Sequence, residues 1–116
     1  MPTTTDIPSK NLTLGVGLAS AEGDHFPVHT QRIAKTRLLA MLKKLNAPDV
    51  ILEGEGKYTN AAGDTFTEPC LSLVWYGRGN DRFFVKEVQR KATQWCQLFE
   101  QEAFALTIGA ATIHTL

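Results

Sequence analysis

Two acidic residues are the strongest candidates for acid–base chemistry in this sequence. Glu53 and Glu55 are two positions apart in a stretch typical of a β-strand, so their side chains would share one face. Neighbouring carboxylates repel each other, so one of the pair tends to keep a proton and can transfer it. Lys57 extends the row and could neutralise both. A charged edge strand that resists aggregation is the more common reason for such a row.

Histidine and cysteine provide weaker candidates. His25 and His29 have a spacing that can bind a metal from one helix, but Pro27 lies between them and interrupts that helical face. We therefore predict no metal site, and no motif indicates a cofactor. Cys70 and Cys96 are too few for a disulfide framework, so we expect two reduced, buried thiols.

The size and composition are those of one ordinary globular domain. The chain has 116 residues, of which 43% are apolar and 21% are charged. Its 12 basic and 12 acidic residues cancel, so net charge alone indicates no polyanionic partner. No apolar run approaches the ~20 residues that a membrane span requires, and no export signal is visible, so we expect a cytoplasmic protein. Residues 1–11 are predicted to be a flexible leader, and 12–116 the domain.

Hydrophobic periodicity divides the domain into strands and helices. Residues 12–18 alternate between large apolar and small residues, which is typical of a half-buried strand. An apolar stripe with helical spacing covers 29–45. Residues 50–76 contain two strands joined by a Gly- and Asn-rich loop. A second amphipathic helix follows an N-cap at Asn80 or Asp81, and a last strand begins at 104.

The resulting order of strand, helix, strand, strand, helix, strand is that of the ferredoxin-like sandwich. We therefore predict an α+β fold with a four-stranded antiparallel sheet and both helices on one face, because right-handed crossovers place them there. Trp75 is predicted to lie under the helices.

The face of the sheet that the helices leave uncovered is the predicted interaction surface. If Val50, Leu52 and the other large apolar residues point inward, alternation leaves small and polar residues outside. Glycine within a strand often allows another group to approach the backbone closely, although a bulge is an equally good explanation. We expect a homodimer or a flat ligand here. The predicted binding residues are Gly15, Gly17, Glu53, Glu55, Lys57, Val74, Tyr76 and Thr107.

Basic residues are concentrated on the predicted helices. Ten of the twelve lysines and arginines lie on or beside the two helices, whereas the loops and hairpin are acidic. This separation could direct an acidic protein or a nucleic acid onto the helical layer. A solvated helix face is the commoner explanation. The residues assigned to this basic face are Arg32, Lys35, Arg37, Lys43, Arg82, Lys86 and Arg90.

Three short motifs occur in a recognisable order: Gly-Glu-Gly-Lys-Tyr at 54–58, Glu-Pro at 68–69 and Phe-Glu-Gln-Glu at 99–102. In this respect the chain resembles a family of small bacterial proteins catalogued only as a domain of unknown function. The match extends over roughly 12–108. The resemblance implies the ferredoxin-like fold and, because the family has no assigned activity, implies no mechanism.

Three functional hypotheses follow from the sequence. The first is a non-enzymatic binding module that self-associates through its open sheet face. The second is a small enzyme of the dimeric α+β barrel kind, in which two sheets enclose a pocket. Its available polar groups would be Glu53, Glu55, Tyr76 and His25. The third is an effector that docks its basic helical face on an acidic protein or a nucleic acid.

Overall fold

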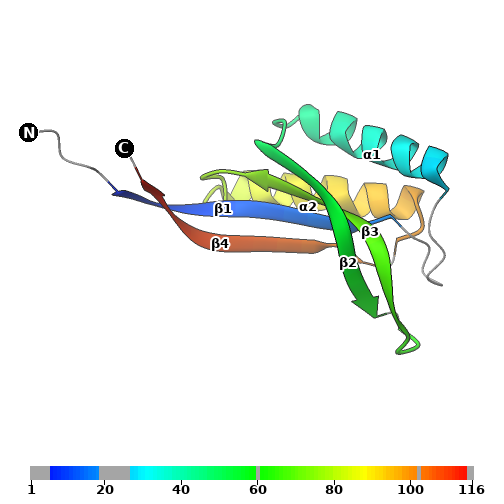
Figure 1. The fold of residues 1–116 in the computed structure, drawn as a ribbon. Coiled ribbons are helices and arrows are strands. Elements are labelled where there is room, and N and C mark those ends of the chain that lie inside the picture. The colour runs from blue at the N-terminus through cyan, green and yellow to red at the C-terminus, as the bar shows by residue number, and fades with distance from the viewer. Residues whose placement is uncertain (1–5, 19–26, 60, 102, 115–116) are drawn as a thin grey trace, which may run out of the picture.

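The structure is a computed structural model that describes residues 6–18, 27–59, 61–101 and 103–114. Its strands form one antiparallel sheet in the order β2-β3-β1-β4, and the two helices pack over one face (Figure 1). This arrangement confirms the predicted α+β fold with ferredoxin-like element order. The elements are β1 (Asp6–Gly17), α1 (Val28–Lys43), β2 (Val50–Thr59), β3 (Thr65–Trp75), α2 (Arg82–Leu98) and β4 (Ala105–His114).

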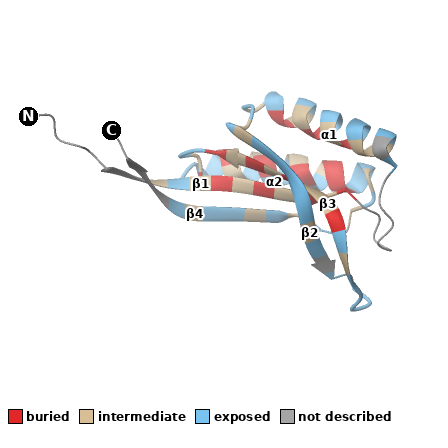
Figure 2. Ribbon diagram, in the orientation of Figure 1, coloured by how far each residue is buried: buried red, intermediate tan, exposed pale blue. Residues whose placement is uncertain are grey.

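The core lies between the sheet and the helices, where Figure 2 shows the buried positions. Leu12, Leu14 and Val16 of β1 are at most 3% exposed and alternate with half-buried residues, as the sequence pattern predicts. Because β1 and β3 are the central strands, their apolar sides are covered most completely. The helices contribute Ala34, Leu38, Leu42, Phe84, Val88, Ala92, Trp95 and Cys96 to the same cluster.

The two helices are joined to each other as well as to the sheet. The indole Nε1–H of Trp95 on α2 donates a hydrogen bond of 2.8 Å to the backbone carbonyl of Ala34 on α1. This bond satisfies a polar group within the core. Within the part of the chain that the structure describes, neither helix has the length and apolar character needed to span a bilayer.

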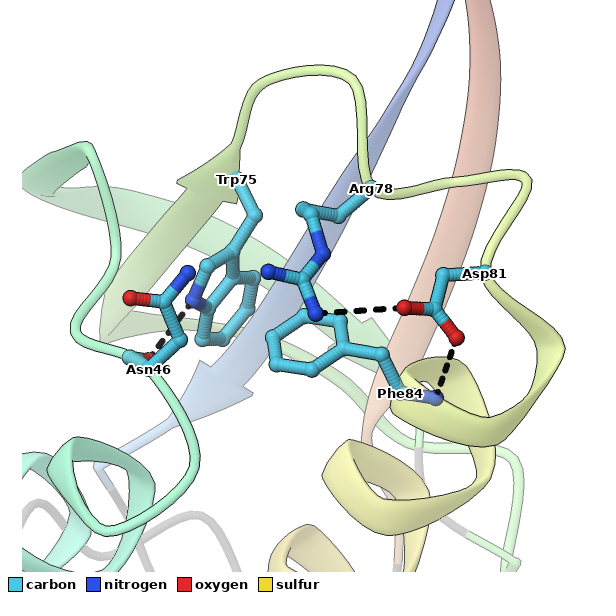
Figure 3. Close-up of polar contacts among 5 residues, drawn as sticks. All are labelled: Asn46, Trp75, Arg78, Asp81 and Phe84. Carbon is cyan, nitrogen blue, oxygen red and sulfur yellow. Dashed lines mark hydrogen bonds and ion pairs between the residues drawn. The ribbon is translucent and has the colours of Figure 1, made fainter.

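A compact aromatic cluster connects the end of β3 to the start of α2 (Figure 3). Trp75 is completely buried, its ring meets Phe84 edge-on at 5.6 Å, and its Nε1–H donates to the carbonyl of Asn46 at 2.9 Å. The Asp81 carboxylate accepts a hydrogen bond from the Phe84 backbone N–H at 3.0 Å, which caps α2. The guanidinium of Arg78 pairs with Asp81 and lies 4.0 Å from the Phe84 ring centroid. Both the burial of Trp75 and the N-cap agree with the sequence prediction.

The first strand begins earlier than the sequence indicates. Residues 6–11, which we assigned to a flexible leader, are part of β1 and pair with β4 as far as Asp6 opposite His114. The alternation of large apolar residues begins only at Leu12, because the outer part of this two-stranded ribbon extends beyond the helices (Figure 1). A pattern that reports burial therefore does not detect it.

The side of the sheet to which the β2 side chains point was predicted incorrectly. Glu53 lies opposite the core residue Leu71 and forms an ion pair with Lys35 of α1, so its side chain faces the helices. Val50 and Leu52, which we expected inside, lie opposite Val74 and Ser72 on the open face. Three consecutive apolar residues contain no alternation, so the sequence could not define which face they occupy. The hairpin register decides it.

Candidate functional site

The open face of the sheet contains one buried carboxylate, that of Glu68 on β3. Its neighbours two and four positions along, Cys70 and Ser72, share this face, whereas Leu71 and Leu73 point into the core. Glu68 is only 9% exposed although no helix covers its side of the sheet. A carboxylate is costly to bury, so its position is a specific feature of this face.

Glycines on the two neighbouring strands make room for this side chain. Gly56 of β2 lies directly opposite Glu68, and Gly17 of β1 lies diagonally across, since Gly17 pairs with Cys70. A Cβ atom placed on Gly17 would lie 2.6 Å from the Glu68 carboxyl carbon and 2.8 Å from its Oε2. The Glu68 carboxylate therefore packs directly against the backbone of β1 at Gly17. The close approach expected at the strand glycines is made by Glu68 of the same chain.

A shallow groove of about 280 Å³ surrounds the carboxylate. Its floor is formed by small residues of β1 and β4, where Gly15 lies opposite Ala105. Lys57 borders the groove from β2, although strand alternation directs its side chain to the same side as Glu53. The groove is lined by Gly15, Val16, Gly17, Gly56, Lys57, Glu68, Cys70, Leu71, Ser72, Ala103, Phe104 and Ala105.

Burial and nearby negative charge both act on the Cys70 thiol in this groove. The pKa of the Cys70 thiol is raised, first by burial and then by the nearby carboxylates of Glu68 and Glu55. Cys70 is thus an unactivated thiol rather than a nucleophile. Among the described residues, no group of three or more His, Cys, Asp or Glu is placed to hold a metal ion.

The structure brings together some of the predicted binding residues and separates others. Gly15, Gly17 and Lys57 line the groove with Glu68. Glu53 pairs with Lys35 of α1, and strand alternation places Glu55 and Lys57 on the same side as Glu53, so the prediction that these three side chains share the open face is wrong. The Glu55 charge still contributes to the raised pKa of Cys70. Three further predicted binding residues, Val74, Tyr76 and Thr107, do not line the groove. His25 lies outside the described residues.

The basic residues of the helices lie away from this groove. Lys35 pairs with Glu53, and Arg90 pairs with Glu87 at 2.6 Å, which lowers the pKa of the Glu87 carboxyl. Pairs this exposed stabilise the fold only slightly. Of the seven residues assigned to the basic face, all but Lys35 have exposed side chains: Arg32, Arg37, Lys43, Arg82, Lys86 and Arg90.

Glu68 is the functional candidate that sequence reasoning missed. It was noticed only as part of a Glu-Pro motif, without a role. A signal was present, because Glu68, Cys70 and Ser72 alternate with Leu71 and Leu73 and so must face away from the core. What could not be predicted is that the strand register places Gly17 and Gly56 beside it.

The fit between Gly17 and Glu68 leads to a prediction on stability. Gly17→Ala should lower the free energy of unfolding by about 1–3 kcal/mol, because the added methyl group displaces a buried carboxylate. In a Glu68→Ala background the same substitution should cost much less, since the obstructing group is gone. Chemical denaturation of the four proteins measures this coupling. Gly54→Ala is the matched control, because no atom lies within 4 Å of its added methyl. If Gly17→Ala lowered the free energy of unfolding equally in both backgrounds, the Glu68 carboxylate would not lie against Gly17.

Cys70 offers a probe of the charge in the groove. Because the Glu68 carboxylate helps to raise the pKa of Cys70, Glu68→Gln should lower that pKa and move the pH profile of Cys70 alkylation to lower pH. Cys96, whose pKa burial raises to about 11, is an internal control that should not change. Mass spectrometry of the alkylated peptides over a pH series measures both thiols. An unchanged Cys70 profile would show that Glu68 is not charged beside it.

Comparison with known proteins finds the same fold in an enzyme. No protein-family model matches the chain, and no curated protein matches it in sequence. One similar solved structure is a phage SAM lyase in complex with S-methyl-5'-thioadenosine, with a TM-score of 0.63 and 19% identity over 91% of this chain and 89% of that one. Phage SAM lyase in the apo state has a TM-score of 0.64 and 18% identity over 93% and 89% of the two chains.

These likenesses show the fold, and they correct the leading functional hypothesis from the sequence. A non-enzymatic interaction module was expected, but both neighbours that share this architecture over most of their length are enzymes. The alternative hypothesis of a small α+β enzyme agrees better with this comparison. The resemblance to a domain of unknown function stays a prediction. This chain is thus a four-stranded α+β sandwich whose fold is similar to that of a phage SAM lyase.

Proposed function

We propose that this protein is a small enzyme that binds and cleaves S-adenosylmethionine, or a closely related sulfonium nucleoside, in the groove around Glu68. The proposal depends chiefly on the position of Glu68. Its side chain is only 9% exposed and lies against the backbone of Gly17 on the open face of the sheet. The bound S-methyl-5'-thioadenosine of the structural neighbour supports the choice of ligand class.

The groove has the features that such a ligand needs. Its sulfonium and ammonium groups are cations, and a carboxylate in a partly apolar groove attracts a cation more strongly than one in water does. The floor at Gly15 and Ala105 has no bulky side chains, so a flat purine ring can lie close to the backbone there, beside the Glu68 carboxylate.

The cleavage that we propose balances without water or a redox partner. The bond from sulfur to the four-carbon amino-acid chain breaks, and sulfur keeps the electron pair to become the neutral thioether S-methyl-5'-thioadenosine. The carbon that loses its bond to sulfur forms a new bond in one of two ways. Either the substrate's own carboxylate oxygen closes a lactone ring on it, or the adjacent carbon gives a proton to Glu68 and forms a double bond. The identity of the second product distinguishes the two routes.

A second copy of the chain is the proposed cover of the groove. A volume of about 280 Å³ is slightly below the roughly 300–1,000 Å³ of typical ligand pockets, and one wall is missing. The open face also presents Leu52 and Tyr76, which are 55% and 56% exposed. Exposed apolar groups of this kind favour an interface. The homodimer predicted from the sequence would therefore close the groove.

A product assay tests the proposed function. Purified protein is incubated with S-adenosylmethionine, and the mixture is separated by liquid chromatography with mass detection. We expect S-methyl-5'-thioadenosine and a four-carbon product to form in equal amounts. Glu68→Gln should abolish most of the turnover, whereas the matched control Glu55→Gln should retain it. No product from folded wild-type protein, or equal turnover by both variants, would refute the proposal.

A further inference from the structure

The helical layer contains a groove on the side away from the sheet, between α1 and α2. Its volume is about 610 Å³. It is independent of the proposed active site, because the helices cover the face of the sheet opposite to Glu68. The lining consists of Arg37, Ala40, Met41 and Lys44 from α1 and Lys91, Gln94, Gln97 and Leu98 from α2. No acidic residue is among them.

Apolar surface extends this groove along α1. A second hollow of about 350 Å³ shares Arg37 and Ala40 with the groove, so the two form one continuous strip. Two exposed apolar residues border the strip, Ile33 at 48% and Leu98 at 56% exposed, both toward the end where α1 begins and α2 ends (Figure 1). A helix of 16 residues is about 24 Å long, so the strip can accommodate a partner of about four helical turns.

The charge at the edges of the strip is exclusively positive. Arg37 and Lys44 form no salt bridge within the described parts of the chain. Lys91 forms none either, but its charge helps to lower the pKa of Glu87 one turn away. This differs from Lys35 and Arg90, which have carboxylate partners. From Val28 to Lys43, α1 contains no acidic residue at all. The basic residues of the groove therefore lie beside the exposed apolar residues rather than being scattered over the helices.

We propose that this groove is a docking site for an acidic amphipathic α-helix of another protein. A helix with carboxylates along one edge would pair with Arg37, Lys44 and Lys91 through charge complementarity. Its apolar side would cover Ile33, Met41 and Leu98, as in other helix-in-groove complexes. A partner that made only the charged contacts or only the apolar contacts would leave part of this surface uncovered, because apolar and basic residues are interspersed along it.

Nucleic acid fits the same surface less well. Phosphates would pair with the basic residues but would leave Ile33 and Leu98 without an apolar partner. No aromatic residue lines the groove, so bases have no stacking surface. Duplex DNA is therefore the rival probe in the experiment.

Fluorescence anisotropy with two labelled probes tests the proposal. The first is a synthetic helix of about four turns with glutamates on one edge and leucines on the opposite side, and the second is a short DNA duplex. Each is titrated with wild-type protein and with three variants. The charge variant is Arg37→Glu with Lys91→Glu, and the apolar variant is Ile33→Ser with Leu98→Ser. The control, Lys10→Glu with Arg82→Glu, makes the same change in net charge outside the groove.

We expect wild-type protein and the control to bind the peptide with similar affinity, and both groove variants to bind it at least about tenfold more weakly. Binding should weaken with added salt because the charges are exposed. Circular dichroism confirms that each variant is folded. Absence of saturable peptide binding at low salt would overturn the proposal. So would DNA binding tighter than peptide binding that is insensitive to the apolar substitutions, since that pattern indicates a general polyanion surface.

Discussion

Replacing Glu68 with glutamine should lower kcat/KM for S-adenosylmethionine on the order of 100-fold while leaving the fold intact. The substitution keeps the shape of the side chain over Gly17 but removes its charge. If Glu68 accepts a proton, the loss should be found in kcat. If it only attracts the cationic substrate, the loss should be found in KM. Steady-state kinetics with the chromatographic assay separates these effects.

Glu55→Gln provides the matched control for this prediction. Glu55 lies on β2, and its carboxylate, like that of Glu68, raises the pKa of Cys70. Unlike Glu68, Glu55 does not line the groove. It should therefore retain most of the activity. A Glu68→Gln protein with normal kinetics would show that the buried carboxylate has a structural role alone.

Trp75→Ala should have the largest effect on stability. Trp75 is completely buried among the core residues, packs edge-on against Phe84 and donates a hydrogen bond to the Asn46 carbonyl. Losing the indole should cost about 3–5 kcal/mol, which is a large part of the total stability of a domain of this size. Thermal and denaturant unfolding measure the loss. Phe83→Ala is the control, because Phe83 is 76% exposed and its loss should change stability by less than about 0.5 kcal/mol. An unchanged melting temperature for Trp75→Ala would contradict the packing described here.

The fold could be predicted largely because periodicity reports burial. In β1 the alternation of Leu12, Leu14 and Val16 with small residues identified both the strand and its inner face. The central strands and both helices have one side in the core, so their patterns are clear. The edge strand β2 is exposed on both sides, and Val50, Ile51 and Leu52 contain no alternation. Its facing depends on the register of the hairpin, in which Thr59 pairs with Thr65 across the loop.

The site was harder to predict than the fold because its parts come from three strands. The sequence indicated Gly15 and Gly17 as places of close approach, and the structure places both in the groove. Glu53 and Glu55 seemed the best acids because they are neighbours in sequence, yet Glu53 pairs with Lys35 of α1. Glu68 has no such neighbour along the chain. Its role depends on the cross-strand register, which no local pattern contains.

The most direct test of the central claim is a nuclear magnetic resonance titration of the protein with S-methyl-5'-thioadenosine. If the ligand occupies the groove around Glu68, the backbone amide signals of Gly15, Gly17, Ser72 and Ala105 should shift in a saturable manner. The signal of Ala40, in the groove between the helices on the other side of the sheet, should not move. Shifts that gather on α1 and α2, or no shifts with the ligand in large excess, would contradict the account.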